Sequence, residues 1–378
     1  MKGYFFSYFN INDLSDGYEG IKSKIRMQLE VFSGFSEIHF VCNRSEYTCI
    51  HKIISRIPWA KTNCDWEFKT EYAEADYIYI RKIAIDRPLI KFIKKIKIWN
   101  PNIIILMEFP NFPYDKEFRG IRNKPYLLKE KLYRRFLKEY VNRMVVYCPI
   151  QFVFGVKTIQ TRNGIDFSKI EIAKNSINPS EIRIIGVANL HYTHGFDRFI
   201  YGLYEYYRTD QIHMKIIFTI VGMGSHYHYL KSLAAKFKLE EFVIFKGTKK
   251  GRDLDQEYEN QDIAIEALGT CRQDINVSSS LKSREYMAKG LPMITDIQID
   301  VIPDDYNFVL RVPKGEMPID MKDVIDFYHR VYDDACIEDI KKDIRELGLK
   351  TCDIRRTMKP IVDYIIEEGK SSDERNEK

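Results

Sequence analysis

The chain lacks the cysteine pattern that a disulfide framework or a zinc site requires. Its seven cysteines are odd in number, and no two of them form a C-x-x-C pair. Because disulfides are rare in reducing compartments, unpaired thiols fit a protein that works in one.

Long apolar runs and a secretory leader are missing as well. No segment approaches the roughly eighteen apolar residues that a membrane span requires. The first ten residues, MKGYFFSYFN, do not combine a basic region with an apolar core and a cleavage site. We therefore expect a cytoplasmic protein without a membrane-spanning segment.

A dinucleotide-binding fingerprint is also absent. The segment 215–224 reads as a buried strand followed by a glycine turn, KIIFTIVGMG. The pattern G-x-G-x-x-G would require glycine at position 227, where the chain has Tyr227. An isolated G-x-G is weak evidence, so a nicotinamide-dependent oxidoreductase is not indicated.

The length and the apolar pattern predict an α/β protein with two domains. The chain has 378 residues, which exceeds what one hydrophobic core usually serves. Short apolar runs alternate with helical segments, as in a parallel sheet with crossover helices. The runs that we expect as strands are 37–42, 76–81, 102–108, 143–148, 183–189, 215–224, 242–247 and 262–268.

Positive charge is concentrated in one part of the chain. Residues 81–143 contain seventeen Lys or Arg against six Asp or Glu, about +11, so the remainder carries about −6 to give +5 overall. Within this part, LIKFIKKIKI (89–98) places Leu89, Phe92, Ile93 and Ile96 on one helical face and its lysines on the other. The segment 129–140 adds basic and aromatic residues.

These basic segments have two interpretations. They are either ordinary surface helices or a surface that docks on an anionic membrane, where each basic residue contributes on the order of 1 kcal/mol. Nucleic acid is not an expected partner, because no recognised binding module accompanies the charge.

The stretch 278–296, SSSLKSREYMAKGLPMITD, reads as a loop, a helix, a turn and a strand. The first turn of such a helix has unpaired N–H groups and favours an anion, and Lys282 lies in that turn. Lys282, Glu285 and Lys289 share one side of the helix. They form either a solvated salt-bridge ladder or a nucleotide-sugar site, where the helix end holds a diphosphate and the carboxylate binds sugar hydroxyls.

The run K-x-x-E-Y-M-A-K-G-L-P at 282–292 resembles the C-terminal signature of family 4 glycosyltransferases. These are retaining enzymes of the GT-B fold, with two Rossmann-like domains facing across a cleft. Further segments stand in the order that the family has them, over most of residues 1–365. They are Asn163-Gly-Ile-Asp166, Gly186-Val-Ala-Asn-Leu190, His194-Gly-Phe-Asp197, Val221-Gly-Met-Gly224 and Phe245-Lys-Gly247.

The resemblance implies a domain organisation. Residues 1–170 would form the acceptor-binding Rossmann-like domain and residues 180–350 the nucleotide-sugar-binding one. Residues 351–368 would form a helix that crosses back to the first domain. Residues 369–378, GKSSDERNEK, would be a disordered tail.

The resemblance also implies site residues. Lys282 and His194 would stabilise the leaving diphosphate, and Glu285 would hold the ribose. Other residues would bind the nucleotide sugar, and a first loop would face the acceptor, although a plain turn explains its glycines equally well. The binding residues are Ser279, Ser280, Leu281, Asn189, Gly224, Gly247 and Thr248, and the loop glycines are Gly17 and Gly20.

Neither a metal nor a cofactor is expected, since the nucleotide sugar is itself a substrate. Asp253 and Asp255 form a D-x-D, a metal motif in other glycosyltransferases. We expect them to begin a helix instead, because acidic residues are favoured in the first turn and the GT-B fold usually needs no metal.

Glu108 lies where an expected strand ends, before a loop rich in proline and aromatic residues. Ligands of open α/β sheets bind beyond such carboxyl ends. Glu108 could therefore orient or deprotonate an acceptor hydroxyl. Alternatively, Glu108 and Asp115 only hold the loop by local hydrogen bonds.

The chain departs from the family at three positions. Asn189 and His194 stand where most members have Arg and Lys, and Val277 stands where many have a glutamate that contacts the transferred sugar. We expect a retaining glycosyltransferase of cell-surface polysaccharide biosynthesis. It would move a sugar from a nucleotide-diphosphate sugar to a glycan acceptor, which we expect to be lipid-linked. The enzyme would work at the inner face of the membrane. The alternatives are a degenerate, non-catalytic subunit of the same fold and another GT-B enzyme, such as a nucleotide-sugar epimerase.

Overall fold

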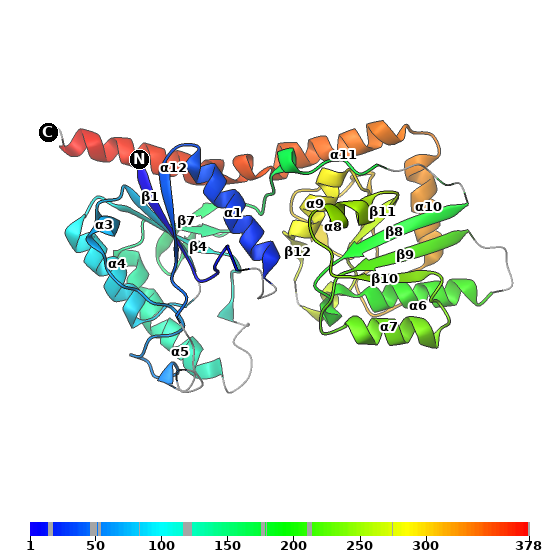
Figure 1. Ribbon diagram of the computed structural model, residues 1–378, viewed down its shortest axis with the longest axis horizontal. Coiled ribbons are helices and arrows are strands. Elements are labelled where there is room, and N and C mark those ends of the chain that lie inside the picture. The colour runs from blue at the N-terminus through cyan, green and yellow to red at the C-terminus, as the bar shows by residue number, and fades with distance from the viewer. Residues whose placement is uncertain are drawn as a thin grey trace. The chain divides into compact units, whose positions relative to one another are not determined.

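The computed structural model describes residues 1–13, 18–45, 51, 54–82, 84–115, 123–174, 178, 180–209, 214–273 and 275–376. The chain divides into two compact units. Unit 1 consists of Met1–Gly164 together with Ile354–Lys378, and unit 2 consists of Ile165–Asp353 (Figure 1). Unit 1 is therefore discontinuous in sequence, and each unit is described by itself below.

Unit 1 is built on a seven-stranded sheet with the order β2-β1-β3-β4-β5-β7-β6. All neighbouring strands are parallel except β6 and β7, which form an antiparallel pair. The strands are β1 (Lys2–Ser7), β2 (Glu37–Cys42), β3 (Tyr77–Arg81), β4 (Ile104–Phe109), β5 (Arg143–Val146), β6 (Phe152–Val153) and β7 (Val156–Gln160).

Helices cover both faces of this sheet, because successive side chains of each strand point to opposite faces. One face packs on α1 (Glu19–Ser33) and α12 (Ile354–Asn376), and the other packs on α3 (Thr70–Ala73) and α4 (Arg87–Trp99) (Figure 1). The connection to β5 contains α5 (Lys124–Tyr133) and the 3₁₀ helix η3 (Arg134–Glu139).

Helix α4 confirms the predicted amphipathic pattern. Leu89, Phe92, Ile93 and Ile96 are buried against the sheet. The helix begins at the capping residue Asp86, whose side chain accepts a hydrogen bond from the amide of Leu89 at 3.1 Å. Its predicted apolar face therefore belongs to the core, while its lysines and the two last residues, Ile98 and Trp99, face solvent.

Helix α12 belongs to unit 1, although it follows unit 2 in the sequence. Ile354, Met358, Ile361 and Ile365 pack in the same core as strands β1, β3 and β4. The helix continues to Asn376, beyond residue 368, where the predicted crossing helix ends, and into the stretch expected to be disordered. The sequence of that stretch has no proline and includes Glu, Lys and Arg, which rank among the better helix formers.

Unit 2 contains a six-stranded parallel sheet with the order β10-β9-β8-β11-β13-β15. Its strands are β8 (Glu181–Val187), β9 (Lys215–Val221), β10 (Val243–Gly247), β11 (Ile263–Ala267), β13 (Met293–Thr295) and β15 (Val309–Arg311), and a separate parallel pair joins β12 (Val277–Ser278) to β14 (Gln298–Ile299). Its helices are α6 (Phe196–Tyr207), α7 (Tyr227–Lys236), α8 (Arg252–Tyr258), α9 (Leu281–Lys289), α10 (Met321–Tyr332) and α11 (Ile337–Cys352).

The helix expected after the three serines is α9. Ser280 caps its start, with its hydroxyl accepting from the amide of Ser283 at 3.3 Å. Gly290 ends it in a left-handed conformation with φ of 73°. A Cβ at Gly290 would lie 2.7 Å from the Cβ of Lys341, so the close approach of α11 also requires glycine there.

The predicted fold class is confirmed in its architecture. Each of the eight runs expected as strands contains a strand, and both large sheets have helical crossovers between parallel strands. Over the part of the chain that the structure describes, no helix combines the length and apolar character needed to cross a membrane.

Candidate functional site

The sequence-predicted nucleotide-sugar residues gather at the carboxyl edge of the unit 2 sheet. Asn189 follows β8, Gly224 follows β9, and Gly247 ends β10 with Thr248 directly after it. The first turn of α9 joins them, because the Lys282 ammonium donates to the backbone carbonyl of Glu266 in β11. Ligands of open parallel sheets bind beyond this edge.

Lys282 is partly buried at this edge. Burial lowers the pKa of its ammonium, while the nearby carboxylate of Glu266 acts in the opposite direction. In the described structure its hydrogen-bond partner is a neutral carbonyl oxygen. A phosphate oxygen placed beside this ammonium would therefore gain more than it would beside a solvated lysine.

His194 lies close enough to Lys282 for their charges to interact. Burial is the main cause that lowers the pKa of His194 to about 3, and the neighbouring Lys282 adds to the effect. Its Nδ1 accepts the backbone N–H of His191 at 3.1 Å, so Nε2 carries the proton of the neutral ring. This geometry favours a neutral hydrogen-bond donor over a charged imidazolium at this position.

Glu285 lies one turn deeper along α9 and is partly buried. Burial raises the pKa of its carboxyl to about 7, with Lys289 acting against this shift and Asp255 adding to it. Lys289 instead pairs with Asp255 of α8 at 2.6 Å. Among the described residues, neither Lys282 nor Lys289 forms an ion pair with Glu285, which disfavours the simple salt-bridge ladder.

The loops after β8 and β9 approach each other through glycine. Gly222 has a φ of 128°, and a Cβ there would lie 1.9 Å from the carbonyl oxygen of Ala188. A Cβ at Gly224 would lie 2.3 Å from the carbonyl oxygen of Leu190. Only glycine allows this packing, which brings Asn189 beside Gly224.

The loop after β10 is more open. Gly247 has a φ of 64°, and its carbonyl oxygen accepts the amide of Gly222 at 2.7 Å. Nothing described lies within 4 Å of a Cβ built at Gly247, and Thr248 is exposed. The position expected to hold the nucleobase therefore has accessible backbone.

The start of α9 is held by a buried arginine that the sequence analysis did not single out. Arg284 is fully buried and pairs with Asp300. It also donates to the hydroxyl of Ser279 at 3.2 Å and to that of Ser283 at 3.0 Å. Arg284 thus fixes the predicted Ser279 and Ser280 loop, while Leu281 begins the helix.

Glu266 is a second buried group at this edge that was not predicted. Its carboxylate accepts the hydroxyl of Ser278 at 3.1 Å, and its backbone carbonyl accepts Lys282. A charged residue inside an apolar strand was the only available signal in the sequence, and that signal does not distinguish a site residue from a structural one.

Glu108 occupies the carboxyl end of β4 in unit 1 and has no exposed surface. Burial opposes its ionisation, but Arg81, Lys24 and a hydrogen bond from Tyr147 outweigh burial and hold its pKa at about 2. A carboxylate of such low pKa is a weak base. Its partners come from other strands and from α1, and Asp115 instead pairs with Arg134 at 2.8 Å.

The remaining predicted positions are the two loop glycines and the D-x-D pair. Gly20 lies in α1 with open space around a built Cβ, and Gly17 lies outside the described residues. Asp253 and Asp255 lie in the first turn of α8, as expected. Throughout the described ranges, no group of three or more His, Cys, Asp or Glu residues is arranged to hold a metal ion.

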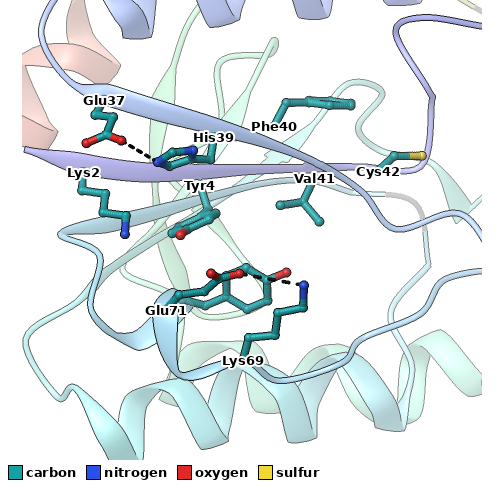
Figure 2. Close-up of a pocket in the computed structure, with 10 residues that line it drawn as sticks. Lys2, Tyr4, Glu37, His39, Phe40, Val41, Cys42, Lys69 and Glu71 are labelled. Atoms are coloured by element: carbon teal, nitrogen blue, oxygen red, sulfur yellow. Dashed lines mark ion pairs between the residues drawn. The ribbon is translucent and has the colours of Figure 1, made fainter.

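A surface recess of about 520 Å³ lies elsewhere, along the β2 edge of the unit 1 sheet (Figure 2). It contains none of the sequence-predicted site residues. Two ion pairs, His39 with Glu37 at 3.0 Å and Lys69 with Glu71 at 3.9 Å, line it, and Tyr4 stacks on His39 (Figure 2). The side chains of these two pairs therefore already have partners within the recess.

Comparison with known proteins places the fold. No family model and no curated protein sequence matches the chain. Solved structures do match, among them a glycosyltransferase from Rickettsia africae (15% identity, TM-score 0.60, 97% of this chain and 98% of that one). Anabaena HepE in complex with UDP also matches, with 13% identity and a TM-score of 0.61 over 97% of this chain and 100% of that one. Sucrose-phosphate synthase from Thermosynechococcus elongatus matches with 13% identity and a TM-score of 0.61 over 97% of this chain and 99% of that one.

These identities are low, so the likeness concerns the fold. It extends over nearly the whole chain and nearly the whole of each matched structure. The α/β GT-B fold predicted from the sequence is thereby confirmed: the chain has the architecture of GT-B glycosyltransferases.

Proposed function

We propose that this protein is a glycosyltransferase that moves a sugar from a nucleotide-diphosphate sugar to a hydroxyl of a glycan acceptor. The observation that carries the proposal is the convergence of Lys282, the first turn of α9 and Glu285 at the carboxyl edge of the unit 2 sheet. The solved complex of HepE with UDP, a protein of the same fold, supports a nucleotide as the ligand.

In this proposal the diphosphate lies against the start of α9. Lys282 and the helix amides stabilise the negative charge that develops as the bond from the sugar C1 to the diphosphate oxygen breaks. His194 donates a hydrogen bond through Nε2. Glu285 accepts hydrogen bonds from the ribose hydroxyls.

The new bond forms between C1 and the acceptor oxygen, and the acceptor proton passes to the departing diphosphate. We propose that attack and departure occur on the same face, with retention of configuration, as the resemblance to family 4 implies. Glu108 is not assigned the role of base, because its low pKa and complete burial disfavour it.

A panel of nucleotides tests the proposal. The thermal unfolding of the wild type is followed with UDP, GDP, ADP, CMP and their sugar conjugates. A ligand present at a hundred times its dissociation constant stabilises the protein by about 2.7 kcal/mol. We expect stabilisation by one nucleotide class, its loss in Glu285→Ala, and its retention in Glu205→Ala, which removes an exposed carboxylate of α6. No stabilisation by any nucleotide would contradict the proposal.

A degenerate, non-catalytic subunit is the second candidate. The neutral state favoured for His194, at a position where the resembled family has a cation, is the observation that supports it. Slow donor hydrolysis or transfer by the purified single chain would exclude this candidate. Nucleotide binding without any turnover would favour it.

We further propose that unit 1 docks on an anionic membrane that carries a lipid-linked acceptor. The segment 54–59 and α5 form a basic–apolar patch, which we define by its exposed residues. Its apolar members are Ile54, Ile57, Trp59, Leu128 and Leu132, and its basic members are Arg56, Lys124 and Lys131.

Hydrogen bonds hold the two parts of this basic–apolar patch together. Buried Lys129 donates to the backbone carbonyls of Ser55 at 2.6 Å and Ala60 at 2.7 Å, and Tyr126 contacts the hydroxyl of Ser55 at 2.8 Å. The side chains of Trp59 and Leu128 are each 67% exposed. Apolar side chains next to basic ones are the combination that binds an anionic lipid surface.

Sedimentation with vesicles tests the membrane proposal. We expect the wild type to pellet with phosphatidylserine-containing vesicles and not with pure phosphatidylcholine. Replacing Trp59 and Leu128 by serine should weaken pelleting at least tenfold, since each buries a large apolar side chain in the lipid. The control variant replaces Met317 by serine, an exposed apolar residue of unit 2. Equal pelleting of all variants would contradict this assignment.

A further inference from the structure

A buried polar cluster occupies the carboxyl end of the unit 1 sheet, on the face covered by α1. Arg81 of β3 and Glu108 of β4 are paired in register, so their side chains point to the same face. Lys24 and Gln28 of α1 reach the same place, with exposures of 5% and 1%. We call Arg81, Glu108, Lys24 and Gln28 the Arg81 cluster.

Glu108 is saturated within this cluster. Its Oε1 accepts from Arg81 Nη1 at 2.7 Å and from the Tyr147 hydroxyl at 2.7 Å, and Lys24 Nζ lies 3.2 Å away. Its Oε2 accepts from the Tyr79 hydroxyl at 3.2 Å and from Gln28 at 3.3 Å. This carboxylate has no remaining capacity to bind a substrate group.

Arg81, in contrast, uses only one edge of its guanidinium. Nη1 binds Glu108, while Nε and Nη2 make no hydrogen bond to any part of the chain that the structure describes. The side chain is only 6% exposed, but these two atoms are not among the fully enclosed polar atoms that lack a partner, so solvent or a ligand can reach them. The edge formed by Nε and Nη2 is therefore available to a ligand.

The shape of this unused guanidinium edge indicates the kind of ligand that it fits. Nε and Nη2 lie on the same side of the guanidinium and form a fork that fits the two oxygens of a carboxylate or a phosphate. The unused edge of Arg81 is therefore complementary to an oxyanion.

The position of the Arg81 cluster matches that of an acceptor group. It lies at the carboxyl ends of parallel strands, the edge at which open α/β sheets bind ligands. Helix α1 also anchors the loop after β1, since Arg26 donates to the carbonyl of Ile11 at 2.8 Å and Lys22 donates to that of Asp13. This is the loop that the sequence analysis expected to face the acceptor.

We propose that Arg81 binds an oxyanion of the acceptor, a carboxylate or a phosphate, through Nε and Nη2. This inference rests on the proposed function and narrows its acceptor to acidic glycans or sugar phosphates. Glu108 holds the guanidinium in place by its bond to Nη1. Arg81 is thus a specificity-determining residue of unit 1.

Acceptor binding is measured without a donor, so that it does not depend on turnover. The probes are D-glucuronate, D-glucose 1-phosphate and neutral D-glucose, added to the Lys282→Ala variant to remove the expected anion site of unit 2. We expect glucuronate or glucose 1-phosphate to bind at least tenfold more tightly than glucose, and Arg81→Gln to remove that preference. Arg81→Lys should restore little of the preference for acidic probes, because lysine keeps the positive charge but lacks the two parallel N–H donors of the guanidinium.

The control variant is Arg143→Gln, which removes an arginine at the opposite, amino end of the same sheet. Its preference for acidic probes should equal that of the parent. If Arg81→Gln alone fails to fold, the double variant Arg81→Gln with Glu108→Gln removes the buried ion pair as a whole and serves the same comparison.

The two acidic probes separate the possible sources of the oxyanion. Preference for glucuronate indicates an acidic glycan, and preference for glucose 1-phosphate indicates a sugar phosphate. Equal binding of all three probes, or an unchanged preference in the Arg81 variants, would overturn the inference. Stabilisation of the wild type by nucleotides is measured in the separate thermal-unfolding panel, so this inference can fail while the proposed function stands.

Discussion

Replacing Glu285 by glutamine tests the environment of the candidate site directly. The carboxyl has an ordinary pKa of 4.5 and a pKa of about 7 in the folded protein, chiefly because of burial. The folded state therefore holds the proton more tightly than the unfolded state. The stability that this group contributes is fully present below about pH 4.5 and is lost as the pH rises through 7.

The magnitude follows from these two values. The difference between a pKa of 4.5 and one of about 7 corresponds to about 3 kcal/mol, and the partial exposure of Glu285 reduces this to about 2 kcal/mol. Glutamine stays neutral at every pH. We therefore expect Glu285→Gln to be about 2 kcal/mol more stable than the wild type at about pH 8, with most of this advantage absent at about pH 5.

The same titration should control donor binding. If the ribose hydroxyls donate to an ionised Glu285, affinity for the nucleotide-diphosphate sugar that stabilises the wild type should rise about tenfold between about pH 6 and pH 8. The diphosphate of this ligand keeps its charge over that range, so it adds no titration of its own. Glu285→Gln should bind more weakly at the upper end of the range and show no such rise.

Urea denaturation and calorimetric titration, each at about pH 5, 6, 7 and 8, measure both effects. The matched control is Glu205→Gln, which changes an exposed carboxylate of α6 and should follow the wild type throughout. A stability difference that does not change with pH would refute the assigned environment of Glu285. A wild-type affinity that is flat across the range would refute its contact with the ribose.

Three further substitutions have defined outcomes. Lys282→Ala should lower turnover more than tenfold without changing thermal unfolding, and wild-type turnover would overturn its role. Glu108→Gln should destabilise unit 1 by about 3 kcal/mol at pH 7, because two buried cations lose their carboxylate. The folded pKa of Glu108 is about 2, so the greater stability of the wild type is present above pH 4.5 and is lost as the pH falls through 2. Unfolding measured over an acid pH series tests this. Gly222→Ala should cost at least about 2 kcal/mol, since φ is 128° and the new Cβ would collide with a carbonyl oxygen, whereas Gly251→Ala, with open space, should cost about 1 kcal/mol in the same denaturation assay.

Periodic features were predictable from the sequence. Strands repeat every two residues and helices about every 3.6 residues, and both periods can be read from the order of apolar residues. The strand runs and the buried face of α4 follow from them. The limits of α9 were predictable because Ser280 and Gly290 are residues with strong local preferences for helix ends.

The buried charges were not predictable. Arg284, Lys24 and Arg81 resemble surface residues in sequence, and their burial depends on partners from distant segments. The pKa of His194 likewise depends on burial and on Lys282, which lies far along the chain. Local preference carries no information about such long-range pairs, so the chemical character of the candidate site required the fold.

The discontinuity of unit 1 has a consequence for synthesis on the ribosome. Unit 2 is contiguous, and its two ends meet where Ile165 bridges Asp353. It can therefore complete its core without the last helix. Unit 1 must wait with one side of its core uncovered until Ile354, Met358 and the rest of α12 emerge. A released chain that ends at residue 353 should thus present a finished second half and a protease-sensitive first half.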